Sequence, residues 1–208
     1  MTVTNFGELK SAIENELRHD DLTNEIPRFI RQGEQRLYQK LRVRFMETNV
    51  NISTVSSQQS DTLPARFRQA RSIYVAGSPN VRLEYRTPVE FWSIYSSFAN
   101  GKPKVFTIEG ENFIWGPTPD VVYTITVLYY KEPDALSEDG DTNGVFTLDF
   151  QLLMYSSLIA SAPFLKNDAR ILVWAQLYEQ CLQEVMESDR RDRYSGDVII
   201  PERMAQLT

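Results

Sequence analysis

Cysteine and histidine are almost absent from this chain, which has 208 residues and only one of each, Cys181 and His19. A single cysteine excludes an internal disulfide, and these two residues alone are too few for a structural zinc site. A serine hydrolase would need His19 as its base, and no Gly-x-Ser-x-Gly segment is present. Cys181 is one helical turn from Leu177 and Val185, which favours a small apolar core residue over a nucleophile.

Glycine is also sparse, at nine residues, and none of the glycines has the spacing of a Walker or dinucleotide-binding loop. The longest apolar stretch, residues 152–165, spans 14 residues and contains serines. A membrane-spanning helix needs about 20 apolar residues. No signal peptide is recognisable, and a lone thiol suits assembly in a reducing cytoplasm. We therefore expect a soluble protein with no cofactor and no membrane partner.

The formal net charge of −6 argues against a protein whose whole surface binds nucleic acid. The charge is unevenly distributed along the chain. Six bases lie in residues 28–44 against one acid, and six acids lie in residues 132–149 with no base. The bases are Arg28, Arg31, Arg36, Lys40, Arg42 and Arg44, and the acids are Glu132, Asp134, Glu138, Asp139, Asp141 and Asp149. Opposite patches suit head-to-tail packing of copies into a ring, while two solvated faces remain the alternative.

Near the N-terminus, apolar residues recur at helical spacing. Asn5 followed three residues later by Glu8 predicts a capped helix over about residues 6–18. A second helix follows, with Thr23 or Asn24 as its cap. Gly33 lies on the buried stripe of that second helix. Its missing side chain would let another helix approach closely, which offsets a helix-propensity cost of about 1 kcal/mol.

The helical period returns near the C-terminus, from Leu148 onward. One helix should run to Pro163, which ends or kinks it. Asp168 can cap a last helix, whose apolar stripe extends from Ile171 to Val185. Beyond the stripe, the charged residues of 184–193 are expected to form a solvated run.

Between these helical ends, from Glu47 to about Leu136, the pattern changes to the alternation of half-buried strands. Strands are predicted around residues 50–55, 73–75, 81–85, 105–108, 113–115 and 121–130. The composition of residues 77–80 and 109–112 indicates turns, which would make two hairpins. Thr87 and Glu90 form a capping box that opens a short aromatic helix. Its core or interface candidates are Trp92, Tyr95 and Phe98.

The order helices, strands, helices predicts an α+β fold. The N- and C-terminal helices would pack as one helical bundle, with an antiparallel β module, a small sandwich or barrel, inserted between them. We expect residues 1–46 and 136–194 to form the bundle, residues 47–135 the β module, and residues 195–208 an extended tail. Val198, Ile199 and Ile200 make an apolar patch in this tail, which we expect to dock on a partner.

Residues 139–144 match the first half of a calcium loop, with Asp139, Asp141 and Asn143 as weak ligand candidates. The match then fails, because the twelfth position is Phe150 where a bidentate glutamate is required. A connecting turn is the favoured interpretation. A calcium-dependent binding module, or an acid-type hydrolase whose carboxylates meet from distant positions, remains the alternative.

One stretch has a more specific pattern. Gly116-Pro117-Thr118-Pro119 forms a proline-stiffened corner before the 121–130 strand, and residues 131–137 end that strand at a second proline. This block closely resembles the head-to-tail adaptor proteins of tailed bacteriophages. Further segments align in the same order, namely residues 6–9, 29–34, 37–42, 63–67, 158–162, 167–170 and Trp174. Arg66 departs from the family, which often has an acid at that position, so a contact made by that acid is not expected here.

The resemblance implies a structural, non-enzymatic neck protein of the virion, assembled in the host cytoplasm. In similar adaptors a dodecameric ring lies beneath the portal, extends the DNA channel and joins the head to the tail. The implied partners are the portal protein, the next tail or nozzle protein, and further copies of the chain, while DNA passes through without specific binding. The six bases of residues 28–44 and the apolar residues 198–200 would then form portal or inter-subunit contacts.

Overall fold

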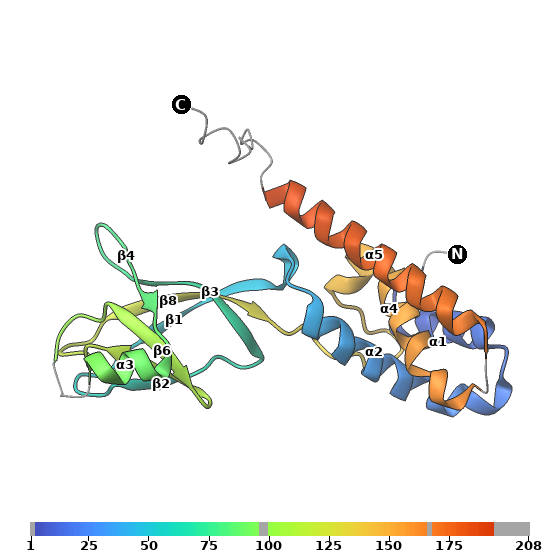
Figure 1. The fold of residues 1–208 in the computed structure, drawn as a ribbon, viewed down its shortest axis with the longest axis horizontal. Helices are drawn as coiled ribbons and strands as arrows, with labels where there is room; N and C mark the ends of the chain where they lie inside the picture. The colour runs from blue at the N-terminus through green and yellow to red at the C-terminus, as the bar shows by residue number, and fades with distance from the viewer. Residues whose placement is uncertain (1–2, 96–99, 166–167, 194–208) are drawn as a thin grey trace. The chain divides into compact units, whose positions relative to one another are not determined.

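The computed structural model describes residues 3–95, 100–165 and 168–193 (Figure 1). Contacts between Cα atoms divide the chain into two compact units: residues 1–45 with 133–208, here called the helical unit, and residues 46–132, called the β unit. The helical unit therefore draws its segments from both ends of the chain. Together with the β strands of the second unit, this confirms the α+β class, with terminal helices in one bundle and an inserted β module.

The helical unit contains α1 (Phe6–Leu17), α2 (Ile26–Lys40), α4 (Gly144–Ala160) and α5 (Arg170–Arg193), with short 3-10 turns η1 (Asp20–Glu25) and η3 (Ala162–Phe164). Helix α4 is central, because α1, α2 and α5 all pack against it. Gly33 on α2 faces Ser156 and Ser157 on α4, both fully buried. A Cβ atom added to Gly33 would lie 2.8 Å from the Ser157 backbone nitrogen, so the close approach predicted for this glycine is confirmed.

The local signals of the helices were only partly predicted. Asn5 caps α1 as expected, with its side chain accepting from the Glu8 amide at 2.9 Å. The predicted cap of α2 is wrong, because the residue before α2 is Glu25 and the Thr23 hydroxyl instead donates to Glu14 at 2.6 Å. The predicted solvated run is wrong in part, because α5 continues as a helix to Arg193 and half-buries Asp189 and Arg193.

The β unit is a sandwich of two four-stranded sheets. One sheet has the order β1 (Glu47–Ser53), β8 (Thr124–Lys131), β3 (Phe67–Val75) and β4 (Val81–Arg82). The other has the order β2 (Ser60–Thr62), β7 (Asn112–Gly116), β6 (Val105–Glu109) and β5 (Glu84–Tyr85). The two hairpins predicted from turn composition, β3 with β4 and β6 with β7, are both present. The core between the sheets is rich in aromatic residues, including Phe106, Phe113 and Trp115.

Two strand predictions are wrong. The strand expected over residues 81–85 divides at Leu83, whose side chain is 2% exposed in the core; β4 joins one sheet and β5 joins the other, parallel to β6. The strand expected from Val121 begins only at Thr124, and Val121 and Val122 are exposed. Because Glu47 pairs with Tyr130, the chain enters and leaves the β unit at the same end of this sheet.

Candidate interaction surfaces

The predicted basic segment lies on α2 and the turn that follows it. Phe29, Ile30, Gly33 and Leu37 form the buried stripe of α2, and the helical period turns its arginines to the outside. Arg28, Arg31, Arg36, Lys40 and Arg44 are exposed and Arg42 is half-buried. The helix therefore presents the predicted bases at the surface of the helical unit.

Four of these six bases contact their own unit. Arg28 pairs with Glu25 at 3.3 Å and its guanidinium lies over the Phe164 ring. Lys40 pairs with Glu179 of α5 at 2.7 Å, and this hydrogen bond raises the pKa of the Lys40 ammonium. The Arg42 guanidinium donates to backbone carbonyls, and Arg44 meets α5 through Asp189 and Asp192. Exposed pairs of this kind contribute little stability, so they help orient side chains more than they hold helices together.

Arg31 and Arg36 differ from the other four bases. Both are exposed, and within residues 3–95, 100–165 and 168–193 neither has an ion-pair partner. The exposed side chains around them on α2 include Arg28 and Lys40, which are paired, and the carboxamides of Gln32, Gln35 and Gln39. We call the unpaired Arg31 and Arg36, together with Gln32, Gln35 and Gln39, the cation–amide face.

The predicted acidic patch is not one surface. Glu132 belongs to the β unit, where it pairs with Arg68 at 2.5 Å. The other acids of the run are in the helical unit. Asp139 pairs with Lys10 of α1, and the Asp149 carboxylate accepts from the Gln151 amide at a break within α4. The acids are thus used locally and are divided between two units.

The candidate calcium loop is hydrogen-bonded to the N-terminal end of α1. Backbone carbonyls of Asp139 and Asp141 accept from the amides of Gly7 and Phe6, each at 2.9 Å. The Asp141 carboxylate accepts from the Ser137 and Glu138 amides, and these bonds lower the pKa of Asp141. One side-chain oxygen of Asp141 thus already accepts from two N–H donors, and the Asp139 carboxylate pairs with Lys10, which favours the connecting-turn interpretation.

Asn143 connects this loop to α2. Its Oδ1 caps α4 by accepting from the Val145 amide at 3.0 Å, and its Nδ2 lies 3.1 Å from the Tyr38 hydroxyl. Tyr38 in turn donates to Glu34, which is 5% exposed, at 3.1 Å. Asn143 thus acts as a structural residue that joins two helices through a buried polar cluster.

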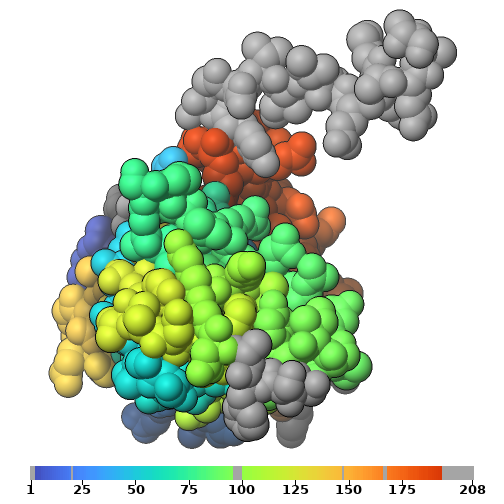
Figure 2. All heavy atoms as spheres, turned by 90° about the vertical axis from the view of Figure 1, so that its left-hand side faces the viewer, coloured from blue at the N-terminus to red at the C-terminus, as the bar shows by residue number. Residues whose placement is uncertain are grey.

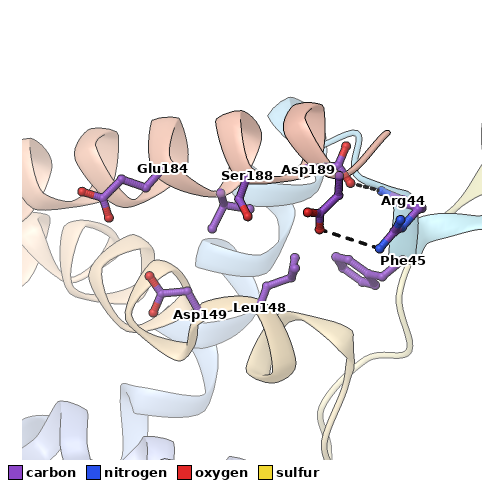
Figure 3. A pocket seen from close by; sticks show the side chains of 9 residues that line it. Arg44, Phe45, Leu148, Asp149, Glu184, Ser188 and Asp189 are labelled. Carbon is purple, nitrogen blue, oxygen red and sulfur yellow. Dashed lines mark hydrogen bonds and ion pairs between the residues drawn. The ribbon is translucent and has the colours of Figure 1, made fainter. Parts of the chain in front are cut away.

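A groove of about 450 Å³ lies between α4, α5 and the end of the N-terminal segment (Figure 3). Its walls carry the carboxylates of Asp149, Glu184, Asp189 and Asp192 and one base, Arg44. Its apolar lining comes from Phe45, Leu148 and Val185. The sequence did not reveal this groove, because the high content of charged residues in 184–193 predicts a solvent-exposed segment. The helical spacing from Val185 to Asp189 would have indicated that the buried side of α5 continues.

The aromatic helix of the β unit is α3 (Pro88–Ile94), and its predicted capping box is confirmed by reciprocal Thr87 and Glu90 contacts. Phe91 is buried against the backbone of Gly116. Trp92 is 41% exposed, Tyr95 is half-buried, and Phe98 lies outside the described residues. The helix is therefore part core and part surface, and Val89 and Ile94 enlarge the surface part.

The family model described as SU10 adaptor protein matches residues 4–201, nearly the whole chain. The chain belongs to the SU10 adaptor protein family. This confirms the resemblance to the head-to-tail adaptors of tailed phages, a structural family whose members associate with other head and tail proteins. No curated protein is similar enough to this adaptor to match it.

The β unit of the adaptor has an apolar tip at the end of its sheet opposite to Glu47 and Tyr130. Val55, Val121 and Val122 are exposed there by 52%, 52% and 66%. Their loops are braced together, because the Ser57 amide donates to the Pro119 carbonyl at 2.8 Å and the Ser56 hydroxyl donates to the Asp120 carbonyl at 2.7 Å. Figure 2 views the β unit from this end, with the two loops, cyan and yellow, next to each other.

The described part of the adaptor contains no group of three or more His, Cys, Asp or Glu side chains that could hold a metal ion. Burial raises the pKa of the Cys181 thiol to about 11, so that it is protonated at neutral pH. Among the helices described, none has the length and apolar character needed to span a membrane. Val198, Ile199 and Ile200 of the predicted docking tail lie outside the described residues.

Proposed function

We propose that this adaptor forms a ring beneath the portal, continues the DNA channel and joins the head to the tail. The helical unit packs against neighbouring copies and docks on the portal protein. The β unit provides a platform for the next tail or nozzle protein. The ring is dodecameric, to match the portal, and lies in the neck of the virion.

The observation that carries this proposal is the division of one chain into two units with separate cores and different surfaces. Residues 46–132 contain eight bases and eight acids, so the whole formal charge of −6 belongs to the rest of the chain. A connector must present one surface to the head and another to the tail. Two units of different charge and different apolar exposure on one polypeptide meet this requirement.

The surface of the helical unit favours protein contacts over DNA contacts. Phosphate binding by a channel wall needs an excess of unpaired bases, and stacking on single strands needs exposed aromatic rings. Four of the six bases on and after α2 contact their own unit, and Tyr38, the aromatic residue interleaved with them, is 2% exposed. DNA therefore passes through the ring without specific binding.

The apolar tip supports the role of the β unit as a platform. Exposed valines on loops that are already held together lose little conformational entropy on binding. Apolar residues in an ordered position are typical of the centre of protein interfaces.

The proposal is tested by mixing the purified adaptor with its portal ring and imaging the product by electron cryo-microscopy. We expect particles with one added tier of density that follows the symmetry of the portal. The portal alone is the control, and native mass spectrometry of the adaptor alone shows whether the ring needs the portal as a template. Portal particles without an added tier, at adaptor concentrations in excess, would contradict the proposal.

A further inference from the structure

The cation–amide face of α2 is a surface that its own unit leaves without a counter-charge. Arg31 and Arg36 are exposed and unpaired within the described residues, and Gln32, Gln35 and Gln39 add neutral hydrogen-bonding groups between them. The one acid within α2, Glu34, is buried against Tyr38 and does not neutralise this face. The face therefore suits a partner surface that carries carboxylates.

The groove between α4 and α5 has the opposite charge. Four carboxylates line it against the single base Arg44. Asp189 and Asp192 already contact Arg44, through the Arg44 amide at 2.6 Å and the guanidinium at 3.7 Å. Glu184 accepts instead from the neutral amide of Gln180 at 2.9 Å, and Asp149 from the backbone amide of Gln151. These two carboxylates thus have neutral donors where a cation would be preferred.

The groove also has room and apolar surface for long side chains. Phe45 and Leu148 at its lining are 36% and 40% exposed. Phe45 is held in place over Gly144, where an added Cβ atom would overlap its ring. The aliphatic stem of an arginine can cover such apolar groups while its guanidinium reaches a carboxylate.

We infer that the cation–amide face of one copy docks into the α4–α5 groove of a second copy, with Arg31 and Arg36 directed at Glu184 and Asp149. Because the face and the groove are different surfaces of the same unit, the contact is head-to-tail: the copy that contributes its face keeps a free groove, and the copy that contributes its groove keeps a free face. Such a contact repeats from copy to copy and closes into a ring when the rotation between copies allows it. The inference rests on the ring of the proposed function and names the surfaces that would build it.

The test is a charge-reversal cycle. The face variant carries Arg31→Glu and Arg36→Glu, and the groove variant carries Glu184→Lys and Asp149→Lys. Each alone places like charges in the contact, and we expect the apparent affinity between copies to fall about tenfold or more, since close interfacial charge pairs couple strongly. The readout is the number of adaptor copies per portal particle as a function of adaptor concentration, together with sedimentation of the adaptor alone.

Two combinations should restore assembly. A chain that carries all four substitutions again has opposite charges where the face meets positions 149 and 184 of the groove. An equimolar mixture of face variant and groove variant should also assemble, because alternating copies place lysine against glutamate at one contact and arginine against carboxylates at the next. Arg190→Glu and Glu138→Lys serve as matched controls, because both residues are exposed and neither lines the groove. The thermal midpoint of every variant is measured, so that loss of folding is recognised.

The outcomes separate this inference from the proposed function. If the wild-type adaptor adds no tier to the portal, the proposed function fails. If the wild type assembles and both reversal variants assemble equally well, the ring remains and the face–groove contact is overturned. If the face variant assembles normally but loses a salt-dependent mobility shift with duplex DNA, the face contacts phosphates and the inference is also overturned.

Discussion

The helical unit and the β unit are stabilised in different ways. The β unit is one continuous segment, residues 46–132, whose two sheets enclose a core in which Phe113 stacks on Trp115 at 5.2 Å. The helical unit joins segments from both ends of the chain, and close backbone contact at Gly33 and polar contacts at Asn143 hold them together. Both units bury an apolar core. In the helical unit, shape complementarity at Gly33 and specific hydrogen bonds at Asn143 additionally fix how the distant segments align.

Removing an aromatic ring from the β core should have the largest effect and should be confined to that unit. Phe113 is fully buried, and Phe113→Ala is expected to destabilise the β unit by about 3–5 kcal/mol. Hydrogen exchange measured by mass spectrometry should show faster exchange in residues 46–132 and unchanged exchange in α2 and α4. Equal acceleration in both units would mean that they unfold together and that the comparison fails.

Overfilling the α2–α4 contact should give the converse result. Gly33→Val places side-chain atoms against Ser156 and the Ser157 backbone, at a cost of about 1–3 kcal/mol that falls on the helical unit. The matched control is Gly140→Val, because a Cβ atom at Gly140 meets nothing within 4 Å. The same exchange experiment should now show faster exchange in α2 and α4, with the β unit protected. A variant as stable as the control would show that the two helices can separate freely.

Removing the side chain of Asn143 should lower the stability of the helical unit by a smaller amount. Asn143→Ala removes the cap of α4 and the contact with Tyr38, and we expect a loss of about 1–2 kcal/mol in the helical unit. Chemical denaturation followed by circular dichroism at the helix band measures the change. Asn143→Asp is the informative companion, since it keeps the cap but places a carboxylate next to buried Glu34, so it should not rescue the variant fully.

The smallest expected effect is on the pH dependence of the thermal midpoint. Backbone amides hold the pKa of Asp141 below its ordinary value, so its contribution to folding is present above the unfolded-state pKa and is lost as pH falls through the folded-state pKa. Asp141→Asn should therefore lower the thermal midpoint at pH 7. The difference from the wild type should shrink below about pH 4, near the ordinary pKa of an aspartate. A difference that stays constant from pH 7 to pH 3 would contradict the role given to the ionised carboxylate.

Signals that depend on a few neighbouring residues could be predicted from the sequence. The Thr87 and Glu90 capping box and the β6–β7 hairpin follow from local turn and cap chemistry, and Gly33 follows from its place on an apolar stripe. Leu83 shows the limit of this approach. Its alternating neighbours are compatible with one continuous strand, and only the presence of two sheets explains why the chain crosses between them there.

The candidate surfaces were less predictable for a related reason. Composition identifies arginines on α2, but it does not reveal that Lys40 meets Glu179, a residue 139 positions away, while Arg31 meets no such partner in the described chain. The groove depends on α5 continuing past Val185, and a dense run of charges obscures that continuation. Pairing over long sequence separations is a property of the fold, and so the surplus charge could be located only in the structure.

The register of Glu47 with Tyr130 has an evolutionary consequence. An insert whose two ends are adjacent on paired strands can be exchanged for another without rerouting the host polypeptide. Phage lineages can then exchange the β unit by recombination while they inherit the helical unit unaltered.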